Sequence, residues 1–238
     1  MQKENVYIIM PVKDAIESAA VSIRAIRQCG YPLCVFDDYS TEENAKRIDE
    51  LSQALSFSVV HIADKYAHPS PNYRWVLQTA RREAIAQSKH LLIVESDVVV
   101  RSETIPMMLR AIGKHVGMVA AITHNQENEI NFPYEYARRI LRRKGARMTE
   151  TNKRLSFCCT LLTLELLQAL DFERLDPAKN WYDVTISHWS TEKGFRNILM
   201  LDNPVLHTPH GSRPWKQLKY THPIKYYWRK LTQHLDRI

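Results

Sequence analysis

The sequence of 238 residues has few glycines and few cysteines, and both shortages narrow the classes of protein to consider. None of its six glycines lies in a glycine-rich phosphate-binding loop. A dinucleotide-binding fold of the GxGxxG type and a P-loop are therefore disfavoured. The four cysteines, two of them adjacent, do not have the spacing of metal ligands. We expect buried free thiols at Cys29, Cys34, Cys158 and Cys159.

Long apolar segments are also missing from the sequence. Runs such as Leu91–Val94 fall far short of the roughly 20 residues that cross a bilayer. The stretch before Pro11 is too short for a secretory signal and has no small-residue cleavage site. We therefore expect a cytoplasmic protein that does not span a membrane.

The chain does contain an ordinary globular composition with an uneven distribution of charge. With 45% hydrophobic and 25% charged residues it can bury one large core, and we expect a single domain over residues 1–238. The net charge is +7, and the basic excess is concentrated in two stretches that outweigh a net-acidic remainder. Residues 136–154 have eight basic side chains against one acidic, and residues 203–238 have seven against one. Such stretches either bind polyanions or form a solvated face.

The first half of the chain alternates short β-rich apolar runs with helical patterns, which predicts an α/β fold with a mostly parallel, Rossmann-like central sheet and flanking helices. The second helix is expected to begin at a capping box formed by Ser40 and Glu43. The predicted strands are Val6–Met10, Leu33–Phe36, Val59–Ile62, Leu91–Val94 and Val116–Ile122. The predicted helices are Ala15–Cys29, a segment ending near Leu55, Tyr73–Gln87 and Ile105–Ile112.

The second half is less regular. We interpret the basic, poorly patterned stretch Asn131–Arg154 as a mobile or substrate-contacting segment. An apolar run follows over Phe157–Leu162, and the spacing then predicts a helix over Val184–Lys193 and a short strand over Ile198–Leu201.

Acidic residues directly follow two of the predicted strands. These are Asp37 and Asp38 after the second strand, and Glu95 and Asp97 after the fourth. Because ligands bind at the carboxyl ends of strands in open parallel sheets, we expect these acids to lie at a ligand-binding edge. A divalent cation held by carboxylates can bind phosphate in place of a glycine-rich loop, although an acid pair after a strand also commonly caps a helix.

Several segments, in the same order, resemble the nucleotide-binding half of family 2 inverting glycosyltransferases, which have the GT-A fold. They are Ile8-Ile9-Met10-Pro11, Val35 to Thr41, and Leu91 to Asp97. The segments Trp181-Tyr182-Asp183, Gly194-Phe195 and Pro204-Val205-Leu206-His207 resemble that family's acceptor half. The resemblance covers residues 5 to about 215. It implies a nucleotide-sugar-binding half over about 1–100 and an acceptor-binding half over about 101–215.

The resemblance implies that six residues bind the nucleotide sugar. They are Pro11, Lys13, Asp38, Arg74, Glu95 and Ser96. Asp38 would contact a uracil-like base, and Arg74 would supply positive charge to the pocket. Glu95, which stands where the family usually has an aspartate, would lie near the ribose or behind the metal ligands.

The resemblance also implies a divalent metal, Mn²⁺ or Mg²⁺, coordinated by Asp97 and approached by His207. Asp183 would be the catalytic base that takes a proton from the acceptor hydroxyl, and this geometry inverts the anomeric centre. An alternative for Asp183 is an N-cap of the helix that starts at Val184. The implied reaction moves a sugar from a nucleotide diphosphate sugar to a glycan or lipid-linked acceptor, in the biosynthesis of cell-surface polysaccharides.

Residues 216–238 have apolar positions at helical spacing beside lysines and arginines, which predicts a basic amphipathic helix. This helix can lie on the inner membrane face or pack on the core. Two other functions stay open. A sugar nucleotidyltransferase would use similar acids, but the glycine- and lysine-rich signature at its N-terminus is missing. A non-catalytic protein could bind nucleic acid or acidic glycans through the basic stretches, but it would not need acids at strand ends, and we expect no nucleic-acid partner.

Overall fold

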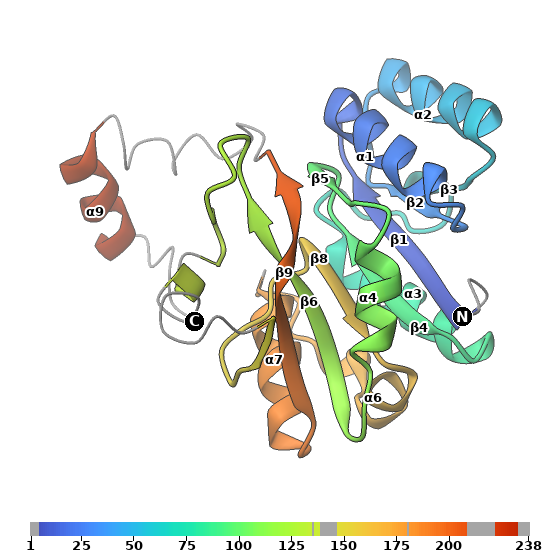
Figure 1. Ribbon diagram of the computed structural model, residues 1–238. Helices are drawn as coiled ribbons and strands as arrows, with labels where there is room; N and C mark the ends of the chain where they lie inside the picture. Colours follow the sequence, from blue (N-terminus) through green and yellow to red (C-terminus); the bar gives the residue numbers. More distant parts are fainter. Residues whose placement is uncertain (1–4, 135, 139–146, 180, 209–221, 233–238) are drawn as a thin grey trace. The chain divides into compact units, whose positions relative to one another are not determined.

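The computed structural model describes residues 5–134, 136–138, 147–179, 181–208 and 222–232 (Figure 1). The chain divides into two compact units, Met1–Thr208 and Pro209–Ile238. The strands of the first unit are β1 Val6–Val12, β2 Cys34–Asp37, β3 Ser58–His61, β4 His90–Val94, β5 Val98–Val99, β6 Val116–His124, β7 Met148–Glu150, β8 Cys159–Leu162 and β9 Arg196–His207.

The same unit contains α-helices and short 3-10 helices between these strands. The α-helices are α1 Ile16–Gln28, α2 Glu42–Leu55, α3 Tyr73–Ala86, α4 Thr104–Arg110, α6 Leu164–Ala169 and α7 Tyr182–Glu192. The 3-10 helices are η2 Ile62–Asp64 and η3 Phe172–Arg174.

The strands form one sheet in the order β3-β2-β1-β4-β8-β6-β9-β5, with β7 paired to β9. Strands β3, β2, β1 and β4 run parallel to one another, and β6 is parallel to β9. Strand β8 is antiparallel to both β4 and β6, and β5 and β7 are antiparallel to β9. The residues Leu91–Val94 of β4 are all buried, as expected for a central strand covered on both faces. The predicted α/β fold with a mostly parallel sheet is confirmed.

Two apolar clusters, one on each face of the sheet, make up the core. One cluster includes the buried residues of α1, α2 and α4, such as Ile23, Ile48 and Met108. The other includes those of α3, α6 and α7, such as Leu77 and Ile186. The helices that follow parallel strands therefore cover both faces, and the carboxyl ends of β1, β2 and β4 lie at one edge of the sheet.

The structure differs from the expected elements in several places. Helix α2 is capped by Thr41, which accepts from Asn44 N, whereas the Ser40 hydroxyl accepts from Asp14 N. The predicted capping box at Ser40 is therefore wrong by one residue, because Ser40 joins the ends of two loops. Strand β9 is longer than predicted, and β5, β7 and α6 were not expected. In the stretch interpreted as mobile, Met148–Glu150 forms β7, while residues 135 and 139–146 lie outside the described residues.

The second unit contains α9, Pro223–Thr232. Ile224, Tyr227 and Trp228 are exposed on it. The rest of the predicted amphipathic helix over 216–238 lies outside the described residues. No helix among the described residues is both long and apolar enough to cross a bilayer.

Candidate functional site

A tight turn after β4 carries the predicted acidic motif. Val98 N donates to the Glu95 carbonyl at 3.1 Å, which closes the turn, and Val98 then pairs with His207 where β5 meets the end of β9. Because both strands are fixed in the sheet, Asp97 is held beside His207. Both residues are buried, with 6% and 3% of their surface exposed.

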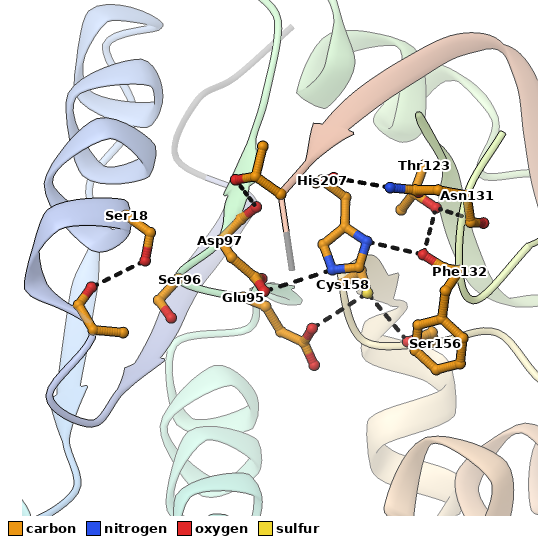
Figure 2. A network of polar contacts seen from close by, with 12 residues as sticks. Ser18, Glu95, Ser96, Asp97, Thr123, Asn131, Phe132, Ser156, Cys158 and His207 are labelled. Carbon is orange, nitrogen blue, oxygen red and sulfur yellow. Dashed lines mark hydrogen bonds and ion pairs between the residues drawn. The ribbon is translucent and has the colours of Figure 1, made fainter. Parts of the chain in front are cut away.

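The ring of His207 is oriented by a backbone carbonyl. Its Nδ1 lies 2.9 Å from the Phe132 carbonyl oxygen, and Asn131 Nδ2 donates to the His207 carbonyl at 2.9 Å (Figure 2). Since a carbonyl can only accept, Nδ1 carries a hydrogen, and Nε2 faces Asp97. The distance from Nε2 to Asp97 Oδ2 is 3.6 Å. A hydrogen bond from the second ring nitrogen to a backbone carbonyl is the support that metal-ligating histidines usually have.

Cys158 also lies beside these residues, and the predicted free thiols are confirmed. All four cysteines are free thiols, and Cys29 alone among them is only partly buried. Glu95 N donates to the Cys158 carbonyl at 3.0 Å, and Cys158 Sγ donates to Glu95 Oε2 at 3.2 Å. The sequence alone does not indicate that Cys158 lies beside Glu95, because only the antiparallel register of β8 against β4 brings the two residues together.

The side chains of this cluster fit a divalent cation. Ligand atoms of Glu95, Cys158 and His207 all lie within 4.8 Å of one another, and the Asp97 carboxylate faces the same imidazole. Carboxylate, thiolate and imidazole are all established ligands of divalent metals. We call Glu95, Asp97, Cys158 and His207 the acidic cluster.

Electrostatics in the acidic cluster disfavour additional negative charge. Burial, followed by the charge of Asp97, raises the pKa of the Glu95 carboxyl, although the Cys158 hydrogen bond and His207 oppose this shift. Burial, followed by the charge of Glu95, raises the pKa of the Cys158 thiol well above its ordinary value. A cation at this position would offset the charge that causes both shifts.

Asp183 and Tyr73 lie within electrostatic reach of the acidic cluster. The charge of Asp183 contributes to the raised pKa of Glu95. The pKa of the Tyr73 hydroxyl is raised mainly by burial, then by the charge of Glu95 and then by that of Asp183. Asp183 lies in the first turn of α7, and the N-cap position belongs to Trp181. The alternative N-cap role for Asp183 is therefore wrong. The hydroxyl of Tyr73, which sequence reasoning missed, is buried and has no hydrogen-bond partner among the described residues.

Asp38 is buried at the end of β2, and its carboxylate organises the loop before α3. Its Oδ2 accepts from Ser70 Oγ and Asn72 N, and its Oδ1 accepts from Asn72 Nδ2, each at 2.8 Å. Pro11 pairs with Phe36 between β1 and β2, and the exposed Lys13 follows β1 directly. These residues share the edge that carries the acidic cluster, and their nucleotide-binding roles stay predictions.

Arg74 and Ser96 each contact a distant part of the chain. Arg74 Nη2 donates to the Glu173 carbonyl at 2.7 Å, and its buried Nε has no hydrogen-bond partner among the residues that the structure covers. The Ser96 carbonyl accepts from Ser22 Oγ at 3.1 Å, which ties the turn after β4 to α1. Neither contact tests the proposed binding of the donor.

No family model matches the sequence, and no curated protein matches it. Solved structures do match. A mycobacterial protein aligns with a TM-score of 0.60 and 14% identity, over 88% of this chain and 69% of that one. Glucosyl-3-phosphoglycerate synthase from Mycobacterium tuberculosis with phosphoglyceric acid aligns with a TM-score of 0.58 and 15% identity, over 94% and 79%. The same synthase with Mn²⁺, uridine diphosphate and phosphoglyceric acid gives 0.56 and 11%, over 96% and 78%.

The fold resembles that of GT-A-like nucleotide-sugar glycosyltransferases. At these identities the likeness concerns the fold, and membership of family 2 stays a prediction. The sequence resemblance and the structural likeness therefore agree on the architecture that places the acidic cluster.

Proposed function

We propose that this chain is a metal-dependent glycosyltransferase that moves a sugar from a nucleoside diphosphate sugar to an acceptor hydroxyl. The observation that carries the proposal is the convergence of Glu95, Asp97 and the oriented Nε2 of His207 at the carboxyl end of β4. The structural neighbour that contains Mn²⁺ and uridine diphosphate supports it, because the fold is similar.

In this proposal Asp97 and His207 hold the cation, and Glu95 lies beside them. The bound cation would offset the charge of the leaving diphosphate. Asp38, Pro11, Lys13 and Arg74 would then contact the nucleoside from the same edge of the sheet.

Asp183 is proposed as the general base. It would take the proton from the acceptor hydroxyl while that oxygen attacks the anomeric carbon on the face opposite the nucleotide, which inverts the centre. Its position in the first turn of α7, within electrostatic reach of Glu95, is compatible with this role. The buried Tyr73 hydroxyl, which is within electrostatic reach of both Glu95 and Asp183, is a candidate to orient the donor sugar.

The proposed acceptor is a glycan or a lipid-linked glycan of cell-surface polysaccharide biosynthesis, presented at the cytoplasmic side of a membrane. The exposed apolar residues Ile224 and Trp228 and the exposed Lys225 on α9 support a peripheral membrane contact. Because a structural neighbour was crystallised with phosphoglyceric acid, this small anionic hydroxy acid belongs in the acceptor panel.

A thermal-shift panel of UDP-, GDP- and dTDP-sugars, each with and without Mn²⁺, tests the proposal. A ligand present at about 100 times its dissociation constant stabilises the folded state by about 2.7 kcal/mol, which raises the melting temperature. We expect a UDP-sugar to do so only with Mn²⁺. No shift with any sugar nucleotide, together with a shift by a polyanion such as heparin, would instead favour a polyanion-binding protein.

A further inference from the structure

Cys158 differs from the adjacent Cys159 in what surrounds its sulfur. Cys159 Sγ lies 3.9 Å from Met108 Sδ in the apolar core, where a structural thiol belongs. Cys158 Sγ instead contacts the Glu95 carboxylate at 3.2 Å and Ser156 Oγ at 3.4 Å, and it belongs to the group with His207 (Figure 2). Both cysteines belong to the same buried apolar cluster, but only Cys158 places its sulfur beside a carboxylate and a hydroxyl.

The donor set has consequences for the choice of metal. Mg²⁺ prefers oxygen ligands in octahedral geometry, whereas thiolate and imidazole together suit softer first-row transition cations. A donor set that combines Cys158 Sγ and His207 Nε2 with two carboxylates is therefore poorly matched to Mg²⁺.

We propose that Cys158 is a thiolate ligand of the bound cation and that it makes the site select Co²⁺, Zn²⁺ and similar transition cations over Mg²⁺. As the metal–sulfur bond forms, the Cys158 proton passes to solvent. The proposal rests on the proposed function, since the same acidic cluster holds the cation, but it assigns a ligand and a selectivity that the carboxylates alone would not give.

Co²⁺ titration of the full chain in the presence of UDP tests the assignment by absorbance. A cobalt–thiolate bond gives an intense near-ultraviolet charge-transfer band, which sites with only carboxylate and imidazole ligands lack. We expect this band in the parent and in the matched control Cys159→Ser, and its loss in Cys158→Ser. Mutation of residues that only support a metal ligand weakens binding by about 10- to 100-fold, so the loss of a direct ligand in Cys158→Ser should weaken Co²⁺ binding by at least as much. Mg²⁺ binding should change far less.

Circular dichroism verifies that each variant is folded, and Cys158→Ala replaces Cys158→Ser if the serine variant is not. A band that survives the removal of Cys158, or Co²⁺ binding by the parent without the band, overturns the thiolate assignment. If the parent binds Co²⁺ without the band, the proposed function still stands, because Asp97 and His207 would still hold the metal. Failure of the parent to bind Co²⁺, Mn²⁺ or Mg²⁺ with UDP overturns both proposals.

Discussion

At the scale of single residues, the surroundings of Asp97, His207 and Cys158 decide their chemistry. Asp97 was expected just after a predicted strand, and His207 was paired with it because both resemble positions of a known family. Cys158 could not be predicted, since its sequence neighbours form an apolar run, and only strand register places its sulfur 3.2 Å from Glu95. The contacts of Asp38 with Ser70 and Asn72 were equally hidden, because they depend on how the loop before α3 folds back.

Asp183→Asn tests the proposed general base. The amide keeps the shape of the side chain in the first turn of α7 but cannot accept a proton. Transfer is therefore expected to fall about 100- to 10,000-fold in kcat, while donor binding changes little. Steady-state kinetics and calorimetry of the donor measure the two effects. Glu192→Gln, the same kind of change at the exposed end of α7, serves as the control. Turnover equal to that of the parent would exclude Asp183 as the base.

At the scale of elements, the parallel strands and their helices could be predicted because periodicity and helix ends mark them locally. The site, however, depends on β5, which is two residues long, and on the last residues of β9. A strand of two residues has no periodic pattern, and its pairing of Val98 with His207 is a contact between segments far apart in the sequence. Such elements cannot be read from local sequence, although they hold Asp97 in place.

The junction of β2, β3 and α2 predicts a pH dependence of stability. His61 lies between Asp37, 2.8 Å from Nδ1, and Asp49, 3.0 Å from Nε2. Burial lowers the pKa of His61, but the hydrogen bonds to both acids outweigh it, and the net shift is upward from 6.5. A histidine whose pKa is higher in the folded state than in the unfolded state stabilises the fold, and this stabilisation is complete at pH values below the unfolded-state pKa. This stabilisation is then lost as pH rises from 6.5 through the raised folded-state pKa.

His61→Asn should therefore lower the free energy of unfolding by about 1.5–3 kcal/mol at pH values below 6.5, which is the usual contribution of hydrogen bonds to charged groups. The loss should be smaller at higher pH. Urea unfolding of parent and variant on either side of this window measures the difference. His188→Asn, at an exposed position of α7, should show no such trend. A cost that is constant or that grows with pH would contradict a charged His61 in the folded protein.

At the scale of the whole molecule, the sequence resemblance and the solved structures lead to the same fold. The single-domain prediction and the division into two halves stay predictions. The basic excess predicted for the end of the chain includes α9, whose described side chains expose both apolar and positive groups.

The α9 surface predicts reversible, salt-sensitive binding to anionic vesicles. Basic residues near such a surface contribute about 1 kcal/mol each, and exposed apolar side chains add to this. The double change Ile224→Ser and Trp228→Ser should reduce sedimentation with phosphatidylglycerol vesicles at low salt. Val21→Ser, at an exposed apolar position of α1, should not. Equal sedimentation of the parent and the double variant would remove the membrane contact from the account.

The central claim is that the acidic cluster binds a nucleoside diphosphate through a divalent cation, and calorimetry of UDP with and without Mn²⁺ tests it most directly. The account predicts UDP binding that requires Mn²⁺ and weakens by at least about tenfold in Asp97→Asn, because a direct ligand is lost. Asp202→Asn, at an exposed position of β9, should bind like the parent. UDP binding of equal affinity without Mn²⁺, or in Asp97→Asn with Mn²⁺, would contradict the account.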